Sequence, residues 1–359
     1  MSYQREFPAR VRVGVVGVGS HSYRNILSAL TFLPVELVAI ADVNEELGAR
    51  TAWQYGLSRS YPTTAEMYAN EDLDAVLLVV SARLHPTLAI EAFEAGLHVY
   101  MEKPAATSVD EVDAMIAARG DRIASVGYKK AFMPATEKAL ELIDSGDLAP
   151  LRTVLGVYPM SIPSAEPTAE TLRQPSQWLA NGCHPLSFLL TVGGPVESIV
   201  VHRGRDDSGV LVLRHTNGVI SNLHLALGAP HSQPFERYSL FGGDATLEIE
   251  NTRKITFQRG IDFEYATTRS FATAGLEQGA VVWEAQDALN SLENRSEFTQ
   301  GLHGGLRSFL DAVLTGTAPQ RGTLEVARQI AAIYEAGFVS HDTAIDVGDG
   351  SRPATTTLR

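Results

Sequence analysis

The chain has 359 residues, of which 45% are hydrophobic and 20% charged, a composition typical of a globular protein of about two domains. Its 42 acidic and 29 basic residues give a formal net charge of -13, which argues against nucleic acid or an anionic membrane surface as a partner. The one cysteine excludes an internal disulfide, and the opening MSYQREFPAR lacks the apolar core of a signal peptide. The longest apolar strand-like run, AVLLVV at 75–80, is too short to span a bilayer, so we expect a cytoplasmic protein.

Residues 1–130 alternate short β-branched runs with helical patterns. Helices are expected at 85–96 and 108–118 and in RNILSALTFL and NEELGARTAWQYG. Strands are expected in VRVGVVGVG, VELVAIADV, DAVLLVVS (74–81), HVYMEKP (98–104) and ASVGYKKA (124–131). These runs are apolar without alternation, as in strands covered on both faces. The order strand, helix, strand predicts an α/β domain with a parallel sheet.

The pattern changes after residue 130. A helix at 134–145 and the strand LRTVLGVYP precede a proline-rich segment at 160–177 and a helical segment around His184. Alternating runs follow, which are typical of antiparallel strands with one covered face. We therefore predict a second, α+β domain over 131–345 with a mostly antiparallel open sheet, and a loose tail at 346–359. Its strands are expected in ESIVVHRG, GVLVLRHT, GVISNLHLAL, ERYSLFG and ATLEIEN, and its last helices at 294–315 and 323–338.

A glycine-rich motif, GVGSHS, follows the first strand and precedes the first helix. Gly17, Gly19 and Ser22 occupy the frame G-x-G-x-x-G, in which the first glycine permits a tight turn and the second lets backbone amides approach a pyrophosphate. Serine in the third position packs less closely than glycine but is able to cap the helix. Asp42 ends the second strand, where a carboxylate hydrogen-bonds the ribose hydroxyls of NAD and repels the extra phosphate of NADP. A glycine turn beside an unrelated aspartate would explain the same residues only through several coincidences.

The second motif is MEKP, which sets Lys103 at the carboxyl end of a predicted parallel strand. Open α/β sheets bind their ligands at this edge, and a lysine there is able to hydrogen-bond a substrate hydroxyl or a developing alkoxide. Taken alone, Lys103 is better explained as a surface lysine at a strand end.

The motifs together resemble those of the Gfo/Idh/MocA oxidoreductases over nearly the whole chain. The segments that carry the resemblance are VRVGVVGVGSHS, VAIADVN, HPTLAIEAFEAGLHVYMEKP, VGYKKAFMPA and NGCHPLSFLL. It implies a Rossmann domain at 1–130 and a substrate-binding and oligomerisation domain at 131–345, in a homodimer or homotetramer. It also implies NAD as the cofactor and no metal.

The resemblance further implies roles for individual residues. Lys103 would lie near the nicotinamide and the reacting hydroxyl, and His184 would be the general base. His85 has an alternative role, which is only to open the helix at 85–96. The remaining implied contacts are Gly17, Gly19, Ser20, His21 and Asp42 for the cofactor, with Ser81, His85, Glu102 and Tyr128 as weaker candidates near the nicotinamide or the substrate.

The chain departs from the family pattern around His184. The family has an aspartate four residues before the histidine and often another acid three residues after it, where this chain has Ala180 and Ser187. If 178–184 is helical, Asn181 lies beside His184 and its amide is able to fix the ring tautomer. Pro185 instead favours a helix that starts near Gly182, and then the contact is not guaranteed. Alternatively, His184 is a hydrogen-bonded residue of the pocket wall and not a general base.

The resemblance implies reversible oxidation of a hydroxyl on a small-molecule sugar or cyclic polyol, with hydride transfer to NAD. Two alternatives remain open: a glycosidase or lyase that oxidises its sugar transiently and retains the cofactor, and a nucleotide-sensing family member without catalysis. The proline-rich segment at 160–177 is a candidate lid over the substrate. Cys183 is expected to be a packing residue, because no metal-ligand spacing surrounds it.

Overall fold

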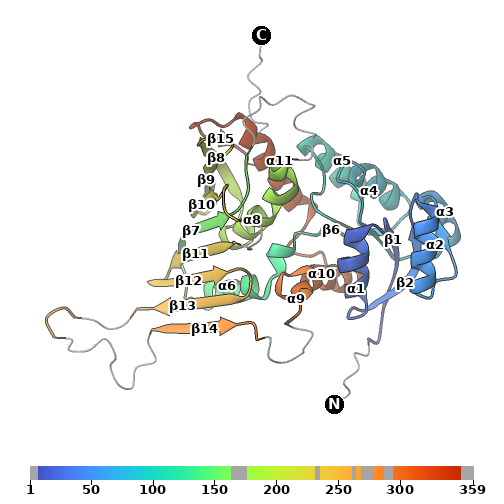
Figure 1. Cartoon of the computed structure of the whole chain (residues 1–359), viewed down its shortest axis with the longest axis horizontal. Helices are drawn as coiled ribbons and strands as arrows, with labels where there is room; N and C mark the ends of the chain where they lie inside the picture. The colour runs from blue at the N-terminus through green and yellow to red at the C-terminus, as the bar shows by residue number, and fades with distance from the viewer. Residues whose placement is uncertain are drawn as a thin grey trace, which may run out of the picture.

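Two β-sheets organise the computed structural model, which describes residues 7–162, 176–230, 235–260, 264–267, 279–286 and 294–348 (Figure 1). One sheet is built from the first third of the chain and the other from the remainder, as expected. The candidate lid lies mostly outside the described residues. No helix in the described part of the chain is long and apolar enough to cross a membrane.

The first sheet has six parallel strands in the order β3-β2-β1-β4-β5-β6. This order, with crossover helices between the strands, is that of the Rossmann fold and confirms the predicted α/β class. Most of its strand residues are buried, which accounts for the uninterrupted apolar runs. The strands are β1 (Val11–Val16), β2 (Val35–Ala41), β3 (Ser60–Tyr61), β4 (Ala75–Leu78), β5 (His98–Met101) and β6 (Ala124–Val126).

Three helices of this domain begin at residues whose side chains cap them. Asn44, Thr63 and Ser108 each accept a hydrogen bond from a backbone N–H in the first turn of the following helix, a contact worth about 1 kcal/mol. The segments are η1 (Ser22–Ile26), α1 (Leu27–Leu30), α2 (Glu45–Gln54), α3 (Thr64–Asn70), α4 (His85–Glu94) and α5 (Val109–Arg119).

The strand predicted at 124–131 is shorter than expected. It ends at Val126, and the chain turns at Gly127 into the 3-10 helix η2 (Lys129–Phe132). A side chain at Gly127 would lie 2.8 Å from the hydroxyl oxygen of Tyr100, so the backbone approaches the neighbouring strand closely at this turn. The turn brings Lys129 to the carboxyl edge of the sheet.

The second sheet has nine strands in the order β14-β13-β12-β11-β7-β10-β9-β8-β15. All neighbours are antiparallel except β7 and β10, so the predicted mostly antiparallel sheet is confirmed. The sequence did not predict β13, β14 or β15. The strands are β7 (Leu151–Tyr158), β8 (Val196–Arg203), β9 (Gly209–His215), β10 (Ile220–Leu225), β11 (Arg237–Gly242), β12 (Ala245–Glu250), β13 (Lys254–Arg259), β14 (Ala280–Glu284) and β15 (Ile345–Asp346).

The predicted tail begins later than residue 346. Ile345 and Asp346 pair with β8, and the N–H of Val347 donates to the carbonyl of Glu197 at 2.9 Å. Residues 349–359 lie outside the described part of the chain.

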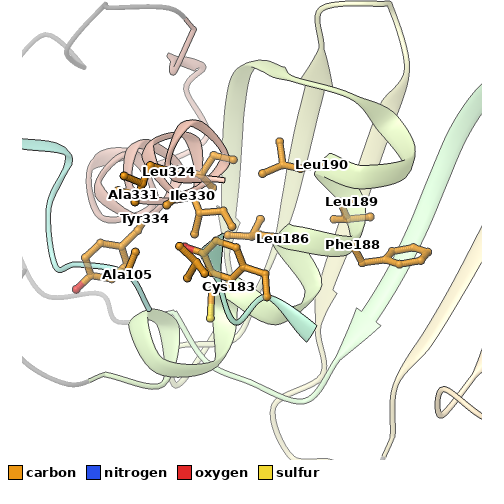
Figure 2. Close-up of a cluster of buried hydrophobic side chains, with 14 of the residues drawn as sticks. Ala105, Cys183, Leu186, Phe188, Leu189, Leu190, Leu324, Ile330, Ala331 and Tyr334 are labelled. Atoms are coloured by element: carbon orange, nitrogen blue, oxygen red, sulfur yellow. The ribbon is translucent and has the colours of Figure 1, made fainter. Parts of the chain in front are cut away.

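Helices α6 (Pro134–Asp144), α8 (Gln177–Gly193) and α11 (Leu324–Val339) belong to the second part of the chain. Figure 2 shows the apolar contact between α8 and α11, in which Cys183 and Leu186 lie near Ile330 and Tyr334. The same cluster includes residues of β7, β8 and β9, so these two helices cover one face of the second sheet.

The helix predicted at 294–315 is broken into α9 (Ser296–Thr299) and α10 (Leu302–Thr315) by Gly301. Gly301 has a φ of +85°, and a Cβ there would lie 2.1 Å from the carbonyl oxygen of Lys129. Although α10 falls in the second predicted domain, it packs on the parallel sheet, where Phe309 lies 5.8 Å from the ring of Tyr100. The late segment 296–302 is thereby held against η2.

Candidate functional site

A cleft of about 320 Å³ lies at the carboxyl edge of the parallel sheet, where β5 and β6 meet α8 and the segment 296–302. Four of the predicted site residues line it together: His21, Glu102, Lys103 and His184. They come from three separate parts of the sequence, and the fold alone brings them together. Asn25, Gly127, Lys129, Ser296, Glu297, Gln300 and Leu302 complete the wall.

The glycine-rich loop beside the cleft has the geometry that a dinucleotide requires. Gly17 has a φ of +84°, and a Cβ there would lie 2.5 Å from the carbonyl oxygen of Val79. Only glycine therefore fits this turn, which follows β1 and leads into the first helix. A Cβ at Gly19, by contrast, would meet no atom within 4 Å. The loop therefore leaves open space above the start of the helix, where backbone amides favour a phosphate.

Ser22 does not cap the helix as we expected. It lies inside the helical segment and is buried, and its hydroxyl has no hydrogen-bond partner in the described part of the chain. Helical structure already begins at Ser20 and His21, so position 22 faces the packed side of the helix rather than its end. The residue acts as a small packing group, which is the structural role of the third glycine in the motif.

Asp42 follows β2 directly and connects to the glycine-rich loop. Its Oδ2 accepts a hydrogen bond from the N–H of Val18 at 2.8 Å, and its Oδ1 accepts one from the N–H of Asn44 at 2.8 Å. Each carboxylate oxygen retains a second lone pair for another donor. The carboxylate is therefore held in place at the end of β2, and it also stabilises the loop.

Lys103 leaves the end of β5 and reaches across to α8. Its Nζ donates a hydrogen bond to the backbone carbonyl of Ala180 at 2.9 Å, and its backbone N–H donates to Oε2 of Glu102 at 3.2 Å. The other oxygen of Glu102 lies 3.4 Å from Nε2 of His21. This contact joins the loop at the cofactor side to the lysine at the strand end.

His184 lies on α8 with 6% of its surface exposed. Its Nδ1 is buried and has no hydrogen-bond partner among the described residues, which agrees with the absence of an acid at Ala180. Burial, followed by the positive charges of Lys103 and Lys129, holds the pKa of His184 well below its usual value. The ring is therefore neutral at neutral pH and able to accept a proton.

Asn181 forms no hydrogen bond with His184, although both lie on α8. The helix α8 begins at Gln177, and Ser176 caps it by accepting a hydrogen bond from the N–H of Leu179, so the alternative start near Gly182 is wrong. The side-chain amide of Asn181 donates to Oε1 of Gln177, one turn earlier. Pro185 lies inside the helix and has no N–H to offer the carbonyl four residues before it.

Three weaker candidates lie outside the cleft wall. His85 is fully buried at the start of α4, and its Nδ1 lies 2.9 Å from the carbonyl oxygen of Pro104, a structural contact that agrees with its role as a helix-opening residue. Tyr128 is buried, and burial raises its pKa well above the usual value. Ser81 is exposed but does not line the cleft. Cys183 is buried in the apolar cluster, as expected, and burial raises its pKa to about 11.

Lys129 is a cleft residue that the sequence analysis missed. Its Nζ donates to Oε1 of Gln300 at 2.5 Å. Burial and the neighbouring Lys130 lower the pKa of Lys129 to about 8. Lys130 itself forms a buried ion pair with Glu236 at 2.5 Å. No clear signal for it is present in the sequence, because the strand predicted over 124–131 includes Lys129, whereas the observed strand already ends at Val126.

Comparisons with known proteins identify an oxidoreductase family and a shared fold. Residues 11–128 match the model of the GFO_IDH_MocA group, described as an oxidoreductase family with an NAD-binding Rossmann fold. D-xylose 1-dehydrogenase (NADP(+)) 2 of Haloferax volcanii is 26% identical over 351 residues, which cover 93% of this chain and 99% of that protein. An uncharacterised oxidoreductase of Rhizobium meliloti is 32% identical over 152 residues, but the match spans only 45% of that protein and 41% of this chain.

Solved structures share the fold over nearly the full length. Levoglucosan dehydrogenase, solved in complex with NADH and levoglucosan, superposes with a TM-score of 0.78 at 17% identity, covering 95% of this chain and all of that chain. At 17% identity, this similarity shows that the two proteins share a fold that includes both sheets.

Proposed function

Because the chain belongs to the Gfo/Idh/MocA oxidoreductases, whose NAD-binding Rossmann fold it carries at residues 11–128, we propose that it is an NAD-dependent dehydrogenase of a sugar or cyclic polyol. One observation supports this assignment most directly: Lys103 and His184, from different parts of the chain, line one cleft with His21 of the glycine-rich loop. Relatives named as sugar or inositol dehydrogenases support the same substrate class.

The residues around the glycine-rich loop fit a dinucleotide. Gly17, Gly19, Ser20 and His21 would surround the phosphates, since the loop leaves open space at Gly19. Asp42 would accept hydrogen bonds from the ribose hydroxyls, and its charge favours NAD over NADP. When bound, the nicotinamide accepts a hydride from the carbon that bears the reacting hydroxyl.

Lys103 and His184 would act on the hydroxyl itself. The ammonium group of Lys103 stabilises negative charge that develops on the oxygen. The imidazole of His184 is neutral because its pKa is low, so it is able to accept the hydroxyl proton. With no acid partner at position 180, His184 gives up that proton more readily than a histidine paired with aspartate.

The test is a panel of sugars and polyols, assayed with NAD by the absorbance of NADH. We expect turnover of at least one panel member, and His184→Ala should reduce kcat/KM by ~10²–10⁴, the usual contribution of a general base. Lys103→Ala should lose most of the turnover while its circular dichroism and melting temperature stay near those of the wild type, since the Lys103 side chain contributes little to the core. Near-wild-type activity of both variants would contradict the assignment.

A non-catalytic role is the second candidate, and Ala180 in place of the family's aspartate is the observation that favours it. A nucleotide sensor would bind NAD with no turnover of any panel member. A glycosidase or lyase that retains its cofactor would convert its sugar without net formation of NADH. Product analysis by mass spectrometry beside the absorbance assay distinguishes these outcomes.

A further inference from the structure

Two lysines enter the cleft from neighbouring strands. Lys103 follows β5 and Lys129 follows β6, and these strands pair with each other in the parallel sheet. The carboxyl ends of parallel strands lie at the same edge, where such sheets bind their ligands. The two ammonium groups therefore share one cleft, and His21 and His184 line it as well.

Neither ammonium group is paired with a carboxylate in the described part of the chain. Lys103 donates to the backbone carbonyl of Ala180 at 2.9 Å, and Lys129 donates to the side-chain carbonyl of Gln300 at 2.5 Å. Both acceptors are uncharged. Lys130, next in the sequence, differs in this respect, because it is paired with Glu236 and does not line the cleft.

Two carboxylates line the cleft, and Oε1 of Glu102 is buried without a hydrogen-bond partner among the described residues. Glu102 accepts the backbone N–H of Lys103, and its second oxygen lies 3.4 Å from the ring of His21. Glu297 accepts the hydroxyl of Ser296 at 3.4 Å. Neither forms an ion pair with the side chain of Lys103 or Lys129 among the described residues.

Partly buried charge of one sign is costly, because burial removes water and the like charges repel each other. Burial, followed by the charge of Lys130 and then that of Lys103, lowers the pKa of Lys129 to about 8, while Glu236 and Glu102 oppose the shift. A carboxylate bound beside Lys129 would neutralise the charge and remove this cost. A neutral sugar offers no such compensation, and polarising one hydroxyl oxygen requires only one ammonium group.

We propose that Lys129 binds a carboxylate of the substrate, so that the substrate is a uronic, aldonic or related polyhydroxy acid rather than a neutral sugar. The inference rests on the proposed function, which assigns Lys103 to the reacting hydroxyl and leaves Lys129 for a second group of the same molecule. Lysine acts here as a point charge, so the carboxylate anchors the molecule while the hydroxyl is oriented toward Lys103 and His184.

The test measures binding and turnover separately. Calorimetry on the protein saturated with NADH compares D-glucose with D-glucuronate and D-gluconate, and D-galactose with D-galacturonate. The same pairs are then assayed for NADH formation from NAD. The variants are Lys129→Met, which removes the charge, and Lys129→Arg, which keeps it. Lys138→Met removes one positive charge from α6, where Lys138 pairs with Glu141, and controls for net charge.

We expect at least one acid to bind the wild type about 10-fold or more tightly than its neutral parent, a difference of about 1.4 kcal/mol. Lys129→Met should bring this ratio close to one, whereas Lys129→Arg and Lys138→Met should preserve it. Equal affinities in the wild type, no acid binding at all, or an unchanged ratio in Lys129→Met would overturn the inference. If neutral sugars are oxidised and acids are not bound, the dehydrogenase assignment stands and the anion site falls. If acids bind through Lys129 but no NADH forms, the anion site stands and the dehydrogenase assignment falls.

Discussion

Restoring the family's acid by Ala180→Asp should raise the pKa of His184. Residues four apart on a helix have Cβ atoms about 5–6 Å apart, and position 180 lies one turn before His184 on α8. Two opposite charges about 5 Å apart interact by ~3 kcal/mol at an effective dielectric constant of about 20, which corresponds to about 2 pKa units. Lys103 contacts the carbonyl of Ala180 and would attract the new carboxylate too, so we expect a shift of about 1–2 units.

The sign follows from the charged form that is stabilised. An adjacent carboxylate favours imidazolium, so the rise of kcat/KM with pH, which reports the base in the free enzyme, should move to higher pH. Histidine-selective NMR gives the same pKa without a substrate, with His184→Gln to assign the signal. Ala180→Asn is the matched control, because it adds a polar group of the same shape without charge. The reasoning fails if Ala180→Asp leaves the titration unmoved, or if Ala180→Asn shifts it equally.

Three further perturbations test separate parts of the structure. Asp42 should make NAD bind more tightly than NADP, and Asp42→Ala should reduce the difference between the two affinities. Calorimetry showing equal or tighter NADP binding to the wild type would refute this. Lys130→Met leaves the largely buried carboxylate of Glu236 without its cationic partner, so denaturant unfolding should show a loss of about 3–5 kcal/mol, and a loss below about 1 kcal/mol would mean that the pair contributes little. Asn181→Ala should keep kcat/KM within about twofold, because its amide donates to Gln177 and not to His184; a loss above about tenfold would restore Asn181 as a partner of the ring.

The sequence predicts most of the parallel sheet because its strands are buried on both faces and appear as continuous apolar runs. β3 escapes prediction because two residues, Ser60 and Tyr61, carry no periodicity. β13 was missed although Ile255 and Phe257 alternate with polar residues and are buried, and β14, at the end of the second sheet, has no buried residue. Ser22 was assigned to a cap because residue type alone does not locate the first turn of a helix.

The candidate site was predictable only where a strand end marked it. Lys103 follows a clear apolar strand, so its position could be derived before its contacts were known. The proximity of Lys129 to Gln300 could not, because 171 positions separate them and only the packing of α10 on the first sheet joins them. The absence of a partner for Nδ1 of His184 among the described residues could not be derived from the sequence either. It depends on the side-chain amide of Asn181, which donates to Gln177 instead of contacting the ring.

The packing of α10 on the parallel sheet also bears on the order in which a growing chain becomes stable. Leu306, Phe309 and Leu310 cover apolar residues of the first strands, yet they are synthesised after nearly all of the second sheet. A ribosome-bound chain that ends near residue 130 would expose this surface, and such surfaces promote aggregation and chaperone binding. Segment 296–302 arrives with the same helix, so the cleft has one wall missing until synthesis is almost complete. An isolated fragment 1–130 should therefore be poorly soluble, and one that also carries residues 294–315 on a linker should be more soluble.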